Sequence, residues 1–308
     1  MLYRQSYAKI APTATPAITG ISGIAPNQQL SQNFRVKWIP AFLCALTLNT
    51  QAEKATDFIR VDEDEKAARL QTGITTYQKE DLSVSLIGAV HIADKAYFKK
   101  LNARFKKQDK ILFEMIGGEN MAKIQKNAAR DEVVDISAMA KTYAMVARFL
   151  DLSEQKKEID YTAKNFVHAD FTLEEFQKLQ EERGETIFSF AMKAAEGAEE
   201  QAQLSPEKLL QTLISGNSNA VKLEVVHSLG KGDEQMGGLG GQSVIITDRN
   251  KKCFAVLDKE IEKGSKQLGI FYGAAHFPDI EKTLLSRGFK KKSHQWLTAW
   301  DIPKTKLR

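Results

Sequence analysis

Two histidines occupy the same local setting in this chain. Gly88-Ala-Val-His91 and Gly273-Ala-Ala-His276 each follow an apolar run, and the same separation joins the two glycines and the two histidines. An imidazole transfers protons near neutral pH and is a common metal ligand. A single motif of this kind is usually a hydrogen-bonded turn, so it is the repetition that predicts a site to which both histidines contribute.

The segments around the motifs are typical of a strand that ends at the glycine and a helix that begins after the histidine. Apolar residues alternate with serines over 82–88, which predicts a strand, and Asp94 is placed to cap the next helix. The short apolar run 110–118, which ends in glycines and has a strand end at Glu114, predicts a second strand, so the three elements form a βαβ unit with parallel pairing. Ligands bind outside the carboxyl ends of such strands, where both motifs lie.

Glu114 ends this predicted strand and would join the histidines at this edge of the sheet. A carboxylate in an apolar context is costly to bury unless it is paired, which favours a role for Glu114. Two histidines and a glutamate suit a divalent metal such as Mn, Fe, Co or Zn, or an acid/base site without metal. The residues alone leave both chemistries open.

The rest of the chain predicts an α/β fold. Residues 119–229 are mostly helical in pattern, Thr172 and Glu175 form a capping box, and residues 237–241 are a glycine-rich hinge. Residues 242–250 predict another strand or an extended approach to the next helix. We expect a parallel-rich central sheet built from two related strand–GxxH–helix halves, with a helical insert between them.

The domain boundaries follow from this pattern and from the first 52 residues, which contain no Asp or Glu. Arg35 and Lys37 precede a short apolar run that ends before Ala52, which is the order of a secretory signal peptide. The run is too short to span a membrane. We therefore expect an exported protein, periplasmic or extracellular, with an organelle transit peptide as the alternative. The expected parts are a leader at 1–52 and a single domain at 53–308, divided into 53–120, the insert 121–242, and 243–308.

Charge and cysteine content limit the partners. The net charge is +5, and the basic runs near the C-terminus lack interleaved aromatic residues and any nucleic-acid motif. They are typical of solvated surface, so no nucleic-acid partner is expected. Cys44 and Cys253 cannot form a disulfide framework, and neither has a neighbour at zinc-ligand spacing.

The motifs together resemble one family. The segments "LIGAVHIADKAYFKKL…KILFEMIGG" and "ITDRNKKCFAVLDKEI…GIFYGAAHFPDIEKTLLSRGF" are similar to the TraB/TIKI family, which includes GumN and PrgY. Its hallmark is two GxxH motifs, a Glu after the first, and an Arg before the second. The wider superfamily includes erythromycin esterases and a haem-binding ChaN-like lipoprotein. TIKI-type members are secreted or membrane-tethered metalloproteases that use manganese or cobalt.

The resemblance implies a metal-dependent hydrolase of a peptide or amide bond. It implies His91 and His276 as metal ligands, with Glu114 as a further ligand or the general base. Arg249 would hold a carboxylate or the developing oxyanion, although an ion pair with Asp248 could also explain this arginine.

Two further candidates, His168 and Asp170, lie in "NFVHADFTLEEF", which resembles a His-Ala-Asp segment of some members. The alternative for this pair is a simple helix entry before Thr172. His227 and His294 are expected at the surface or in packing. Two other functions stay open: a non-catalytic binder of haem, iron or a peptide signal, and a metal-independent esterase with His91 or His276 as base.

Overall fold

The computed structural model describes residues 56–128, 138–185, 216–229 and 244–304. Contacts divide the chain into residues 1–53 and 54–308, and all that follows concerns the second unit. The expected leader and the glycine-rich hinge at 237–241 lie outside the described residues, so both stay predictions.

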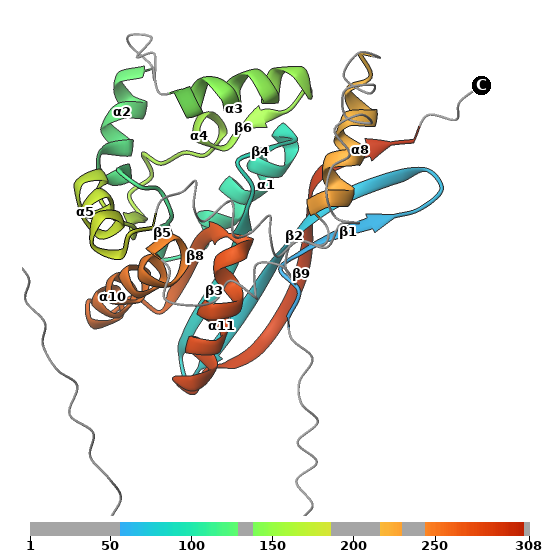
Figure 1. Cartoon of the computed structure of the whole chain (residues 1–308). Helices are drawn as coiled ribbons and strands as arrows, with labels where there is room; N and C mark the ends of the chain where they lie inside the picture. The colour runs from blue at the N-terminus through green and yellow to red at the C-terminus, as the bar shows by residue number, and fades with distance from the viewer. Residues whose placement is uncertain (1–55, 129–137, 186–215, 230–243, 305–308) are drawn as a thin grey trace, which may run out of the picture. The chain divides into compact units, whose positions relative to one another are not determined.

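The described residues form a mixed seven-stranded sheet (Figure 1). Its order is β1-β2-β3-β8-β5-β7, and β9 pairs with β2. The four neighbours β3, β8, β5 and β7 are parallel, while β1, β2 and β9 are antiparallel. The strands are β1 (Ile59–Glu63), β2 (Ala67–Lys79), β3 (Leu82–Ala89), β5 (Lys110–Phe113), β7 (Phe166–His168), β8 (Gln267–Gly273) and β9 (Lys290–Pro303).

Helices pack on the sheet and around its edges, and β4 (Ile92–Ala93) pairs with β6 (Ser153–Glu154) in a separate two-stranded sheet. None of the described helices is long and apolar enough to cross a membrane. The α-helices among the described residues are α1 (Lys95–Phe105), α2 (Met121–Ala128), α3 (Ala138–Phe149), α4 (Gln155–Glu158), α5 (Leu173–Arg183), α8 (Ser218–Leu229), α10 (Arg249–Glu262) and α11 (Phe277–Ser286). The described residues also contain the 3-10 turns η1 (Gly118–Asn120) and η4 (Ala274–His276) and the π-helical turn η3 (Val244–Asp248).

Two hydrophobic clusters lie on opposite faces of the sheet, because side chains alternate along a strand. On β5, Phe113 belongs to the cluster that α1 covers, while Leu112 belongs to the cluster that α10 and α11 cover. The predicted apolar face of α1 is confirmed, since Tyr97, Phe98 and Leu101 are all buried. The α/β class is therefore as expected from the sequence.

The predicted βαβ unit is correct in strand direction and wrong in adjacency. Strands β3 and β5 are parallel, but β8 lies between them and pairs with both. A strand–helix–strand order along the chain predicts that the two strands are parallel. It does not predict that they are neighbours in the sheet. This arrangement brings the two motif-bearing strands, β3 and β8, side by side.

The middle of the chain is not the all-helical insert that the sequence suggested. The short β7 joins the main sheet beside β5, with Phe113 paired to His168. Phe166 packs edge-on against Phe105 at 5.3 Å between ring centroids. Three residues are too few for a period-2 pattern, so tertiary contacts decide this strand.

Two local expectations also need correction. Within the segment 242–250, where a strand or an extended approach was expected, the described residues form the π-helical turn η3 and the start of α10. Ile246 of η3 is buried, and a short apolar run does not distinguish a buried strand from a buried turn. Asp94 precedes α1 as expected, but its side chain makes no capping bond. Its Oδ2 instead accepts from the N–H of Asp301 at 2.8 Å.

Candidate functional site

Glu114 follows β5 directly and lies at the carboxyl edge of the parallel strands. Both oxygens of its carboxylate accept short hydrogen bonds. Oε1 accepts from Nη2 of Arg249, and Oε2 accepts from the backbone N–H of Gly273, each at 2.6 Å. The side chain is 15 % exposed. Strands β5 and β8, together with the start of α10, therefore meet at this carboxylate.

Arg249 is the first residue of α10, and its side chain is almost fully buried. Its Nε donates to Oδ1 of Asp170 at 3.0 Å, and its Nη2 donates to Oδ2 of Asp170 at 2.6 Å. Because Nη2 also donates to Glu114, one guanidinium nitrogen joins two carboxylates. A local pair with Asp248 does not explain this arginine, since Asp248 pairs with Lys251 and with Arg183.

His276 ends the turn η4, just before α11, and is 3 % exposed. Its Nδ1 lies 2.7 Å from Oδ1 of Asn250. Nδ2 of Asn250 donates to the carbonyl of His276 and to Asp279, which leaves Oδ1 as an acceptor and places the ring proton on Nδ1. Nε2 then faces Oε1 of Glu114 at 3.6 Å, which is longer than a hydrogen bond.

The charges of this cluster support one another. Burial alone would raise the pKa of the Glu114 carboxyl, but the charge of Arg249, the neighbouring imidazole of His276 and the N–H of Gly273 hold it well below its usual range. Burial acts to lower the pKa of Arg249, and the carboxylates of Glu114 and Asp170 raise it. Glu114 and Arg249 are therefore both ionised.

The two motif glycines have different surroundings. A Cβ at Gly88 would lie 3.0 Å from Cβ of Thr72 and 3.1 Å from the carbonyl oxygen of Gly73, so this glycine permits close approach of β2. A Cβ at Gly273 would lie 3.4 Å from Oε2 of Glu114, which is an ordinary contact. The N–H of Gly273 binds the carboxylate of Glu114, whereas the missing side chain at Gly88 allows β2 and β3 to pack closely.

The structure places His91 in a different environment from His276. His91 is exposed and lies between β3 and β4, where its carbonyl accepts from the N–H of Gln155 at 2.8 Å. The paired strands put Ala89, rather than Gly88, opposite Gly273, so the two motifs are staggered by one residue. In the parts of the chain described, no three His, Cys, Asp or Glu side chains converge as a metal would require. The role of His91 as a ligand stays a prediction.

His168 and Asp170 differ in their contacts. Asp170 binds Arg249 within the cluster, whereas His168 binds the backbone next to Glu114. Nε2 of His168 lies 2.7 Å from the carbonyl of Met115, one residue after Glu114. This contact holds the backbone beyond β5. Sequence reasoning gave no role to Asn250, which follows Arg249 on α10 and orients His276. An Arg-Asn pair at a helix start is the signal that could have identified it.

The residues do not fit a resident divalent cation as they stand. Both oxygens of Glu114 already accept hydrogen bonds, and the charged Nη2 of Arg249 lies 2.6 Å from the oxygen nearest His276. A metal bound by Glu114 and His276 would meet this guanidinium at close range and be repelled. Arg249 would have to leave Glu114 before a metal could enter.

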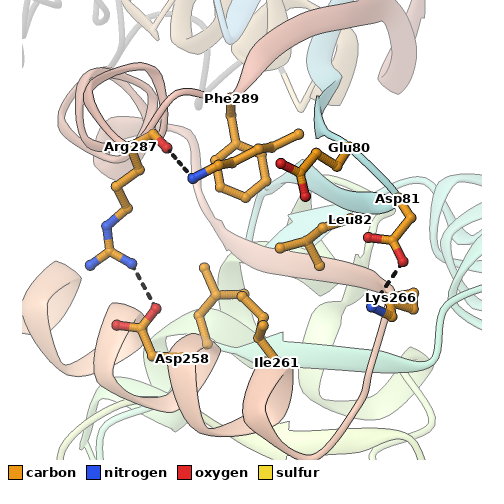
Figure 2. A pocket seen from close by; sticks show the side chains of 10 residues that line it. Glu80, Asp81, Leu82, Asp258, Ile261, Lys266, Arg287 and Phe289 are labelled. Carbon is orange, nitrogen blue, oxygen red and sulfur yellow. Dashed lines mark hydrogen bonds and ion pairs between the residues drawn. The ribbon is translucent and has the colours of Figure 1, made fainter.

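A cavity of about 610 Å³ lies at the other end of the strands (Figure 2). It is lined by the start of β3 at Leu82, the end of α10, and Lys266 before β8. Two ion pairs lie in its lining: Lys266 pairs with Asp81 at 2.9 Å, and Arg287 pairs with Asp258 at 2.7 Å. This hollow at the amino edge is separate from the cluster at the carboxyl edge.

Comparisons with known proteins give no match: no family model, no curated protein and no solved structure is similar to this chain. The resemblance to the TraB/TIKI family therefore rests on the quoted motifs. The chemistry of the site has to be argued from its geometry.

Proposed function

We propose that the chain is a hydrolase of an amide or ester bond in a peptide or small molecule, with His276 and Glu114 at its centre. The observation that carries this proposal is the buried cluster of Glu114, Arg249, Asp170 and His276 at the carboxyl edge of the parallel strands. Removing such charges from water costs several kcal/mol per ion, on the order of the stability of many domains. Clusters of this kind are enriched at functional sites.

In this proposal, His276 is the general base. Its Nε2 takes a proton from water as the water oxygen attacks the substrate carbonyl, and it returns that proton to the leaving group when the amide or ester bond breaks. Asn250 keeps the other ring proton on Nδ1. Ionised Glu114 faces Nε2 and stabilises the imidazolium that forms. Arg249 is a positioning residue, since its guanidinium is committed to Glu114 and Asp170.

The metal-dependent form is the second candidate, and the resemblance to TIKI-type proteases favours it. It makes His91, His276 and Glu114 ligands of Mn, Co, Zn or Fe, and it requires Arg249 to move away from Glu114. The metal-free form requires no such movement, so the described contacts favour it. Chelation separates the two forms.

The remaining expectations belong to the same proposal. The acid-free leader and its apolar run support export to the periplasm or the extracellular space, with an organelle as the alternative. The side-by-side placement of β3 and β8 supports the view that the two strand–GxxH–helix segments are related halves of one domain. A peptide or small amide or ester is the expected substrate, and no nucleic-acid partner is expected.

The test is a hydrolysis screen of the full chain on fluorogenic peptides and chromogenic esters. His276→Gln should lower turnover by about 100-fold or more, as expected for loss of a general base. His227→Gln is the matched control, because His227 is an exposed histidine paired with Glu63. Turnover that survives chelators supports the metal-free form. Turnover that chelators abolish and Mn²⁺ or Co²⁺ restores supports the metal-dependent form. Absence of turnover on every substrate, with haem, iron or peptide bound instead, would favour a binding protein.

A further inference from the structure

Arg249 stands where a bridging cation would stand. Its Nη2 lies 2.6 Å from Oε1 of Glu114 and 2.6 Å from Oδ2 of Asp170. The two carboxylates come from neighbouring parallel strands, since Glu114 follows β5 and Asp170 lies two residues beyond the end of β7. Cation–oxygen distances in proteins are about 2.0 to 2.6 Å. The nitrogen therefore lies between the two carboxylates, where a shared metal would lie, at the long end of these distances.

A third donor lies beside the same oxygen. Nε2 of His276 is 3.6 Å from Oε1 of Glu114, and the histidine side chain is 4 % exposed. The hydrogen bond of Nδ1 to Asn250 leaves Nε2 as the nitrogen on this side. Two carboxylates and one imidazole form a donor set that suits Mn²⁺, Fe²⁺, Co²⁺ or Zn²⁺. The donors do not converge on one point while the guanidinium lies between the carboxylates.

We infer that Glu114, Asp170 and His276 form a cation site that Arg249 fills as a built-in cation. The guanidinium supplies the positive charge between the two carboxylates that a metal would otherwise supply, and it excludes divalent metals by charge and by volume. Removal of the guanidinium therefore converts the site into one that binds a divalent metal. This inference concerns binding and does not depend on the hydrolase proposal.

The test is metal binding by the full chain, measured by elemental analysis after dialysis and by titration calorimetry with Mn²⁺, Co²⁺ and Zn²⁺. Wild type should carry no stoichiometric metal that depends on Glu114. Arg249→Ala should bind one equivalent, with an affinity on the order of 100-fold above that of wild type, because a unit charge has been removed from contact with the ligands. Arg249→Lys keeps the positive charge and is the matched control, which should bind no metal.

Thermal unfolding gives a second readout, which can also be used if Arg249→Ala is much less stable than wild type. Metal should raise the midpoint of this variant and leave that of wild type unchanged. Guanidinium ion at a non-denaturing concentration should compete with the metal in Arg249→Ala, because both occupy the same place. Asp170→Asn added to Arg249→Ala should abolish the gain in affinity. Stoichiometric metal in wild type that disappears in Glu114→Gln would overturn the inference, and so would an Arg249→Ala chain that no metal binds or stabilises.

Discussion

The two copies of the Gly-Ala-x-His motif lie on neighbouring strands and yet serve different purposes. Gly88 allows β2 to approach, while the N–H of Gly273 binds Glu114. His91 is exposed, while His276 is buried against Glu114. A repeated sequence therefore gives the same strand and a helix after it, but it does not give the same chemistry.

Asp94 and Asp279, which each follow the motif histidine by three residues, extend the contrast. Asp94 of the first copy binds the backbone of β9 through the N–H of Asp301. Asp279 of the second copy accepts from Asn250, which in turn orients His276. The first copy thus joins elements of the scaffold, whereas the second builds the charged cluster. What differs is the neighbour: α10 supplies Arg249 and Asn250 to the second copy.

The largest expected loss of stability comes from a change beside the second copy of the motif. Arg249→Leu should lower the free energy of unfolding by about 3 to 5 kcal/mol, because it leaves the buried carboxylates of Glu114 and Asp170 without their counter-charge. Urea denaturation measures the change. Arg69→Leu is the matched control, since Arg69 makes its ion pairs at the surface and should change stability little. Equal losses in both variants would contradict the account of the cluster.

The glycines separate packing from chemistry. Gly88→Ala should lower the free energy of unfolding by about 1 to 3 kcal/mol, because the new methyl group is forced against Thr72 and the carbonyl of Gly73. Gly273→Ala should cost less stability, because its Cβ makes an ordinary contact with Glu114. Chemical denaturation of both variants tests this order. A larger loss of stability for Gly273→Ala would reverse the roles assigned here.

Acid should weaken the second copy through Glu114. The pKa of Glu114 is lowered in the folded chain, so its stabilising contribution is fully present above about pH 4.5 and is lost as the pH falls through the folded value. Glu114→Gln cannot titrate, so its stability should fall less steeply on acidification. Urea midpoints measured from neutral pH to pH 3 test this. Parallel curves for wild type and Glu114→Gln would contradict the ion pair with Arg249.

The smallest effect is expected at Asp94 of the first copy. Burial raises the pKa of this carboxyl, so its charge slightly opposes folding at neutral pH. Asp94→Asn keeps an acceptor for Asp301 and should be neutral or slightly stabilising. Asp94→Ala loses the acceptor and should cost about 1 kcal/mol. Thermal unfolding of the two variants gives the comparison, and a loss in Asp94→Asn equal to that in Asp94→Ala would show that the charge itself is needed.

The sequence predicted the strands with clear patterns and the residues that follow them. The alternation before Gly88, the apolar run before Glu114 and the capping box at Thr172 were all confirmed. The three-residue β7 was missed because it depends on pairing with β5. The insertion of β8 between β3 and β5 was also missed, because strand order is set by packing between distant segments.

The site was predicted in part. Glu114, Arg249, Asp170 and His276 do meet, since all follow strand ends or begin helices at one edge of the sheet. The direct contact of Arg249 with two carboxylates was not predictable, because side-chain direction at a helix start depends on the fold around it. The repeated motif also predicted that His91 and His276 would be equivalent. In the fold, His91 is exposed and His276 is buried, because different elements surround the two copies.

The most direct test of the account compares the two histidines in the same assay. Once a hydrolysed peptide or ester is found, kcat/KM is measured for wild type, His91→Gln and His276→Gln, with unfolding midpoints to confirm that each variant is folded. The account predicts that His276→Gln loses about 100-fold or more in kcat/KM and that His91→Gln loses less than about tenfold. Equal losses in the two variants would contradict it and would return both histidines to one shared site.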